Sequence, residues 1–292
     1  QDNVLIGKNA ADSLTTGGNN VIIGKQAGDG FTANTTMTLI GSEAGTAINS
    51  NNANGTVAVG YQSLVSLTSG ATNTAIGTRS GDAATTASGS VFLGNNAGGS
   101  ITTGNQNIAI GLNAMNGGTT TGDNNIAIGK SAGDALTSGY KNIFMGLDAG
   151  GAATTAAGNI AIGNESLKSA TTGIHSNVAI GTAAMSGVTG ADFVVAIGNA
   201  AGEANMGSGA DGTVLIGAYA GNQIQSGERN IAIGFQSLSQ DGDMDDSIAI
   251  GYQALHGTAI GTNNKNIAIG NYALDANMTH NVQNIAIGHN AL

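Results

Sequence analysis

Asn107-Ile108-Ala109-Ile110-Gly111 is the clearest copy of a short motif that accounts for most of this chain. The same letters, NIAIG, return at 125–129, 159–163, 230–234, 266–270 and 284–288, and varied copies bring the total to seventeen. The final glycines of successive copies lie 17 to 19 residues apart. A fixed period over a whole chain indicates a solenoid, in which each repeat stacks on its neighbours.

The residues before the glycine have the pattern of a strand. We number each repeat from this glycine, which is position zero. Position −1 is apolar in every repeat, and position −3 is Val or Ile in all but two, Thr38 and Thr74. Residues two apart share one face of an extended segment, and β-branched residues favour strands. We therefore predict one short strand per repeat, with the −3 and −1 side chains inside the coil.

The other face of this strand is also apolar. Position −2 is Ala in eleven repeats and larger in six, whereas position +4 is Leu or Met in eight, Gly in eight and Ala in one. A large −2 residue never occurs with a large +4 residue, as in the pair of Phe92 and Gly98. Because interiors are close-packed, this exchange predicts one compartment shared by −2 and +4. A coil this short has no room for two cores, so we expect neighbouring chains around an axis to share the second, giving a homotrimer. The alternative is a monomer with a local pocket beside the turn.

Two further positions predict ladders that run from coil to coil. Position −4 is Asn in eleven repeats, and stacked asparagines can hydrogen-bond along the axis and to turn backbone. Position +8 is Thr in ten of the first eleven repeats, which predicts a stacked row. This row consists of Thr15, Thr32, Thr68, Thr85, Thr102, Thr119, Thr137, Thr154, Thr171 and Thr189.

Composition excludes several classes of protein. The 292 residues include 49 Gly but no Pro, which argues against collagen, and the regular apolar positions argue against disorder. A net charge of −10 makes nucleic acid and anionic membranes poor partners. The absence of Cys fits an extracellular chain held together by stacking, and no apolar run reaches the ~18 residues of a membrane span. Since both ends lie within the repeat, we expect one domain, 1–292, that belongs to a longer fibre or stacks end to end.

The repeated NIAIG segments, together with NVAIG at 177–181 and SIAIG at 247–251, resemble the head repeats of YadA-like trimeric autotransporter adhesins. They are also similar to repeats of phage tail fibres. The resemblance implies a left-handed parallel β-roll, three chains about one axis and an adhesive role on a surface. The spacing here is longer than in that family, and no coiled-coil stalk or membrane anchor occurs within these residues.

A search for catalytic patterns is negative. Cys nucleophiles are absent, and His175, His256, His280 and His289 lack the spacing of metal ligands. The glycines are not followed by helices, so they form no nucleotide-binding motif. We therefore predict a protein that is not an enzyme.

The acidic segment 241–246 is the one candidate metal site. The alternating carboxylates of Asp241, Asp243 and Asp245 suit a hard cation such as Ca²⁺. However, Tyr252 stands where the closing glutamate of a calcium loop would be. The alternative is a solvated acidic loop, and no other cofactor is expected.

Four aromatic residues form the one candidate ligand site. Tyr219, Phe235, Tyr252 and Tyr272 occupy positions +1 or +2 of four successive repeats, so stacked coils would align them in an exposed ribbon. Exposed aromatic patches often mark binding, here of a receptor or a carbohydrate. The alternative is a stack that only stiffens one edge. The threonine row raises a remote alternative, ice binding.

Together these patterns predict an all-β protein: a parallel β-solenoid (β-roll) of about 17 coils, assembled as a homotrimer. We expect a structural protein of an extracellular fibre, such as a surface adhesin, a phage tail fibre or a filament subunit. Its expected partners are further copies of itself and a host receptor, glycan or matrix component. The competing expectation is a carbohydrate- or receptor-binding module that uses the aromatic ribbon.

Overall fold

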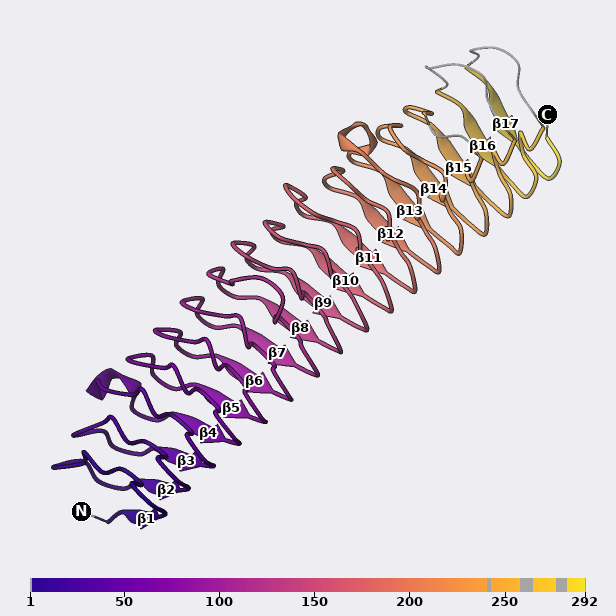
Figure 1. The fold of residues 1–292 in the computed structure, drawn as a ribbon. Coiled ribbons are helices and arrows are strands. Elements are labelled where there is room, and N and C mark those ends of the chain that lie inside the picture. Colours follow the sequence, from indigo (N-terminus) through magenta and orange to yellow (C-terminus); the bar gives the residue numbers. More distant parts are fainter. Residues whose placement is uncertain (1, 241–242, 258–264, 277–282, 292) are drawn as a thin grey trace. The chain divides into compact units, whose positions relative to one another are not determined.

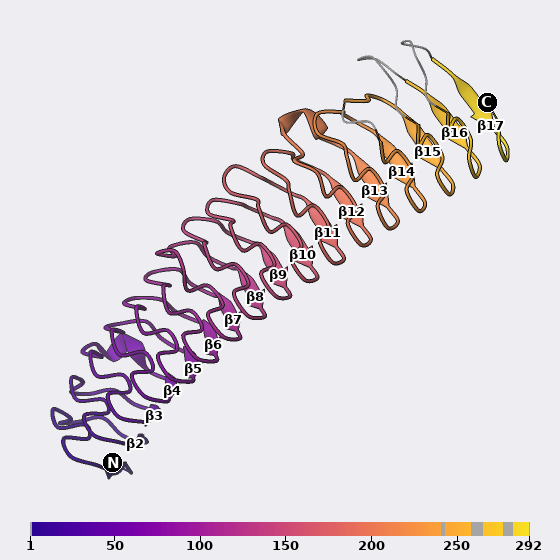
Figure 2. The same ribbon diagram turned by 45° about the vertical axis from the view of Figure 1, so that its right-hand side comes forward.

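The computed structural model describes residues 2–240, 243–257, 265–276 and 283–291. It is an all-β parallel β-solenoid with one three-residue strand in each repeat, as predicted (Figures 1 and 2). The contacts divide the chain into two compact units, Gln1–Asn142 and Ile143–Leu292, which are described separately below. The core of each unit lies inside its coils.

Among the described residues, the first unit contains eight strands and the second contains nine. In the first unit they are β1 Val4–Ile6, β2 Val21–Ile23, β3 Thr38–Ile40, β4 Val57–Val59, β5 Thr74–Ile76, β6 Val91–Leu93, β7 Ile108–Ile110 and β8 Ile126–Ile128. In the second they are β9 Ile143–Met145, β10 Ile160–Ile162, β11 Val178–Ile180, β12 Val195–Ile197, β13 Val214–Ile216, β14 Ile231–Ile233, β15 Ile248–Ile250, β16 Ile267–Ile269 and β17 Ile285–Ile287.

Adjacent strands within each unit pair in parallel and in register, so equivalent positions of the repeat stack directly on one another. In β7 and β8, for example, Ala109 pairs with Ala127 and Ile110 with Ile128. The extra residues of two 19-residue spacings form short 3-10 helices, η1 Asn51–Ala53 and η2 Ser208–Ala210. Each is anchored by its buried last alanine, so the insertions do not disturb the register.

The predicted direction of the strand side chains is wrong. The −2 side chains point into the coil, where Phe92 and Ala109 are both 0% exposed. The −1 and −3 side chains point outward, and Leu93 is 43% exposed. The compartment attributed to neighbouring chains is therefore the chain's own core, and it no longer argues for a trimer. The physical reason is that the chain turns back on the −2 side of the strand, where the buried +3, +4 and +7 residues close the core, so the −1 and −3 side chains are left outside.

The predicted sharing of one compartment by −2 and +4 is confirmed. A Cβ added at Gly98 would lie 2.4 Å from the ring of Phe92, and one added at Gly81 would lie 2.5 Å from the same ring. A large −2 residue thus occupies the +4 space of its own coil and of the coil before it. This explains Gly81, whose own −2 residue is the small Ala75. The sequence comparison within single repeats did not explain this glycine.

Much of the remaining core comes from positions +3 and +7. The small +3 residues are buried, as Ala97 and Ala114 illustrate. The residue before the threonine row also points inward, a pattern that the sequence analysis missed although the residues there are often large and apolar. The fully buried members of this set include Phe31, Ile48, Leu67, Ile101, Leu136 and Ile224.

The predicted asparagine ladder is confirmed. In the first unit, Asn107 Oδ1 accepts a hydrogen bond from the N–H of Asn125 (2.8 Å). Its amide group donates to the carbonyl of Gly122 (2.8 Å). Asn125 repeats both contacts one coil further on, with Asn142 and Gly139. These buried amides therefore satisfy backbone groups that would otherwise lose their hydrogen bonds to water.

The threonines of the predicted row also link successive coils. The hydroxyl of Thr15 donates to the carbonyl of Thr32 (2.9 Å), and that of Thr68 donates to Thr85 (2.9 Å). After Gly111 the row passes through Thr121 rather than the predicted Thr119. In these pairs the hydroxyl proton is donated to a backbone carbonyl, and ice binding by the row stays a prediction.

Candidate functional site

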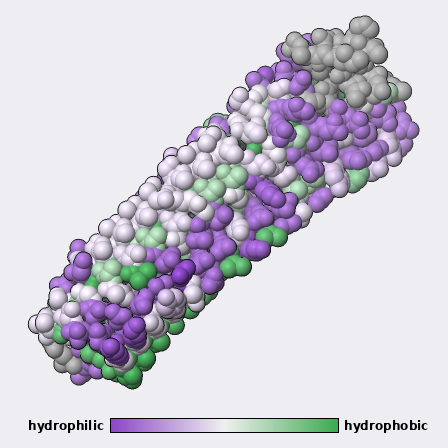
Figure 3. Space-filling view, viewed as in Figure 1, coloured by the Kyte–Doolittle hydropathy of each residue, from purple (hydrophilic) through white to green (hydrophobic). Residues whose placement is uncertain are grey.

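The outward side chains of the strands form a continuous apolar surface in each unit, which we call the strand face. It consists of the −3 and −1 residues, and Figure 3 shows hydrophobic residues gathered along the lower edge of the first unit. Away from the outermost coils, −1 residues such as Ile76 (40%) and Ile233 (36%) are partly exposed. No position from −4 to zero carries a charge in any repeat. Two columns of such side chains that continue from coil to coil form the kind of contiguous apolar surface that often marks an interaction site.

A second surface lies at the turn that follows the strands of the second unit. The rings of Tyr219, Phe235, Tyr252, Tyr272 and His289 contact one another in sequence, and we call them the aromatic ladder. Their centroids are 6.0, 5.5, 5.2 and 6.0 Å apart along the series. The structure thus brings together all four aromatic residues singled out in the sequence.

His289 is a fifth member that the sequence analysis did not place in the ribbon. Its position, +1 of the last repeat, was a sufficient signal. The ladder is open to solvent, since Tyr219, Phe235 and Tyr252 are 38%, 41% and 39% exposed. Only Phe235 and Tyr252 stack in parallel, with an interplanar angle of 9°, and the other three contacts are edge-to-face. Part of the flat surface of the rings is therefore not stacked against a neighbouring ring.

Polar groups lie beside the rings. Gln253 donates an amide hydrogen bond to Gln236 (2.7 Å), one coil before it. The N–H of Tyr252 donates to Asn271 Oδ1 (3.0 Å). Partial burial, reinforced by the neighbouring Tyr252, raises the pKa of the Tyr272 phenol, so this hydroxyl remains a neutral donor near pH 7. The corner offers apolar ring surface and uncharged hydrogen-bonding groups together.

The predicted calcium ligands have partners within the protein. Asp245 Oδ1 accepts from the N–H of Glu228 (2.9 Å), as Asp123 does from Asn105 in the first unit (2.6 Å). Asp243 accepts from the hydroxyl of Ser226, and Asp241 lies outside the described residues. Asp245 therefore occupies a position where a side-chain oxygen links two coils.

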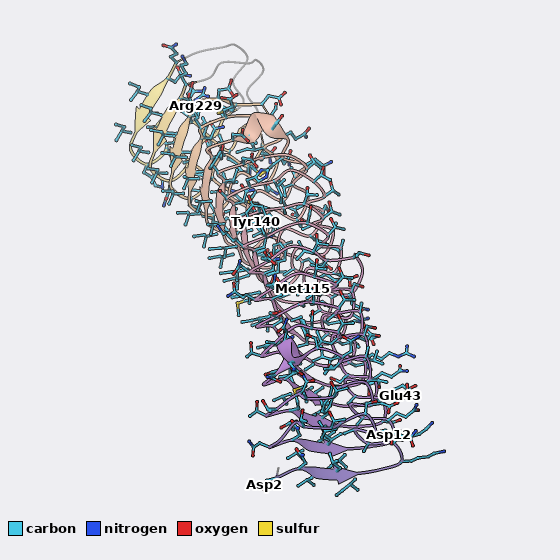
Figure 4. All side chains as sticks on the ribbon, turned by 90° about the vertical axis from the view of Figure 1, so that its left-hand side faces the viewer. Asp2, Asp12, Glu43, Met115, Tyr140 and Arg229 are labelled. Carbon is cyan, nitrogen blue, oxygen red and sulfur yellow. The ribbon has the colours of Figure 1, made fainter. Side chains whose placement is uncertain are left out.

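The neighbouring carboxylate, Asp246, forms an ion pair with Arg229, which is labelled in Figure 4 (Nε–Oδ1 2.6 Å). The hydrogen bond from Arg229 lowers the pKa of the Asp246 carboxyl. Among the described residues, no group of three His, Cys, Asp or Glu side chains is placed to hold a metal ion.

Calcium binding at Asp241, Asp243 and Asp245 stays a prediction, and calorimetry tests it. Because Asp245 and Asp243 already accept hydrogen bonds, we expect at most millimolar affinity for Ca²⁺. The Asp245→Asn variant keeps an oxygen for the Glu228 N–H and should leave the melting temperature nearly unchanged. Strong heat of binding at micromolar Ca²⁺ that this variant abolishes would show that the segment is a true calcium site.

Comparison with known proteins adds no family assignment. No protein-family model matches the chain, and no curated protein matches it significantly. Within the described residues, no helix has the length and apolar character needed to cross a membrane.

Proposed function

We propose that this chain is a non-enzymatic structural segment of an extracellular fibre, in which several copies assemble through the strand face. The observation that carries the proposal is the pair of uncharged apolar columns, −3 and −1, on the outside of the coils. Water exposure of such a surface is unfavourable, and burying it against another copy removes that cost. A partner of complementary charge is not needed, because the face itself has no charge.

A second copy of the chain suits this face better than an unrelated partner. The in-register stacking repeats the same two apolar positions at successive coils of each unit, so the columns of two copies match in spacing along a unit. The resemblance to YadA-like adhesin heads implies three chains and a left-handed coil. Three copies about one axis would bury all three strand faces, and a face-to-face pair would also cover them.

Charged substitutions in the strand face test the assembly. Ile76→Lys together with Leu93→Lys should convert the assembly to monomers, since burying two ammonium groups per chain is strongly unfavourable. In the monomer both side chains reach water, so the fold should persist. Thr78→Lys with Asn95→Lys is the matched control, because it adds the same charges to exposed positions of the same coils. Light scattering gives the mass, and circular dichroism checks the fold.

The wild-type chain and the control should have three times the mass of one chain. A monomeric wild type at micromolar concentration would contradict assembly through this face. If the wild type is a dimer and the two lysines in the strand face dissociate it, assembly through the strand face would be supported, but the threefold arrangement would be contradicted.

A second candidate function rests on the aromatic ladder. Its partly exposed rings and uncharged polar neighbours favour a surface that binds a receptor or a carbohydrate. This role is compatible with the first, because the ladder lies on the turn after the strands and not among the −3 and −1 side chains. A fibre segment that presents such a ladder would supply adhesive contacts.

A further inference from the structure

The aromatic ladder repeats once per coil, and this period restricts what can bind along it. Successive coils of a parallel β-structure are about 4.8 Å apart. The ring centroids follow this repeat closely, at 5.2 to 6.0 Å. A ligand that contacts every ring must itself repeat at about this length and lie parallel to the stack of coils. One sugar ring of an extended β-linked polysaccharide has a comparable length.

The chemistry of the ladder also fits a sugar polymer. A pyranose ring has apolar C–H faces that pack on aromatic rings, and its hydroxyls need hydrogen-bond partners at the edges. The edge-to-face contacts of Tyr219 and Tyr272 leave ring surface that is not stacked against a neighbour. The amides of Gln236 and Gln253 and the side chain of Asn271 supply polar partners beside the rings.

The charge pattern of this corner indicates an uncharged polymer. In the first ten repeats, positions +1 and +2 include Lys8, Lys25, Glu43, Arg79, Lys130, Asp148 and Glu165. From Gly181 onward, the same two positions carry no Lys, Arg, Asp or Glu. The loss of charge begins before the ladder and continues through it. An acidic polysaccharide would find no Lys or Arg at these two positions, in a chain whose net charge is −10.

We propose that the aromatic ladder binds a linear, uncharged, β-linked polysaccharide that lies along the coils, with one sugar residue at each ring. This inference rests on the second candidate function, that the ladder is a binding surface. It adds the class of ligand, its direction and its length. The five rings from Tyr219 to His289 set the number of sugar residues that contribute to affinity.

The length dependence of binding tests this proposal. The probes are β-1,4-linked glucose and N-acetylglucosamine oligomers of two to six residues, titrated calorimetrically into the full chain. For at least one series, the dissociation constant should fall several-fold with each added residue and level off near five. An oligogalacturonate of the same length should bind at least tenfold more weakly.

Tyr252→Ser interrupts the ladder at its centre and should weaken hexamer binding at least tenfold. Tyr140→Ser is the control, because Tyr140 is also exposed but lies outside the ladder. Unchanged melting temperatures and masses show that neither variant alters the fold or the assembly.

The other possible outcomes distinguish failure of the polysaccharide proposal from failure of the second candidate function, that the ladder is a binding surface. Binding that depends on Tyr252 but not on oligomer length would keep the ladder as a binding site and overturn the extended polysaccharide. A protein receptor or a charged glycan that binds through Tyr252, with no neutral oligomer binding at millimolar concentration, would do the same. Oligomer binding that is unaffected by Tyr252→Ser would overturn both.

Discussion

Replacing Phe92 by alanine is expected to lower the free energy of unfolding by about 3 to 5 kcal/mol, the usual cost of removing a buried phenylalanine ring. Phe92 is fully buried, and its ring fills the space above two glycines, Gly81 and Gly98. The cavity would therefore extend over two coils. Urea unfolding followed by circular dichroism measures the loss.

The informative comparison is a variant in which larger side chains at position +4, in the turn, fill the cavity left by Phe92. Phe92→Ala combined with Gly81→Leu and Gly98→Leu recreates the arrangement of three consecutive natural coils, in which Ala at −2 accompanies Leu238, Leu255 or Leu274. We expect it to recover more than half of the lost stability. Full recovery is not expected, because these leucines must adopt a positive φ, which costs about 1 to 2 kcal/mol per residue.

Gly98→Leu in the wild-type background is the matched control, since it adds the leucine without removing the ring. The added Cβ alone would lie 2.4 Å from Phe92, so this variant should be less stable than wild type. If the refilled variant were no more stable than Phe92→Ala, the shared compartment would not explain the exchange between −2 and +4.

Replacing a motif glycine by alanine is expected to have a similarly large effect. Gly163 has φ +138° and lies against the next coil, so that an added Cβ would be 2.4 Å from the carbonyl oxygen of Gly181. Backbone strain and a backbone clash each cost about 1 to 3 kcal/mol. Because the obstacle is backbone held by strand pairing, a side-chain rotation cannot relieve it. Gly163→Ala should lower the midpoint of urea unfolding and increase hydrogen exchange in β10 and β11.

Gly173→Ala provides the matched control. Gly173 also has a positive φ, +66°, but nothing lies within 4 Å of its added Cβ. In this variant the free energy of unfolding should fall only by the cost of placing alanine at a positive φ, about 1 to 2 kcal/mol. Equal losses in the two variants would show that the contact between coils contributes nothing, and that the glycine is needed for its φ alone.

Much of the fold follows from local pattern. The spacing of the glycines predicts the number of coils, and in-register pairing follows because every repeat has the same strand. The asparagine ladder and the aromatic ladder follow from the same logic, since equal positions stack. In these cases the relevant neighbours are the equivalent residues of adjacent repeats, so the sequence contains the information directly.

Two features did not follow from single repeats. Gly81 is small because of Phe92 in the following coil, and only the contact between coils identifies that relation. Asp245 reads as a metal ligand in isolation, but in the fold its carboxylate accepts a hydrogen bond from the preceding coil. For Gly81 the partner is a different position of the following repeat, and for Asp245 it is the backbone of the equivalent position in the preceding repeat.

The sequence alone therefore determined that the chain is a parallel β-solenoid, that −2 and +4 share one space, and that the aromatic residues align. Only the tertiary structure decided which face of the strand is inside. Alternation separates −2 from its neighbours −3 and −1, but both sets are apolar, so hydrophobicity cannot assign them. Closure of the coil does: the turn returns on the side of Ala109, where buried residues such as Ala114 and Met115 complete the core, and the two isoleucines beside Ala109 stay outside. Those isoleucines are consequently available for contact with another chain.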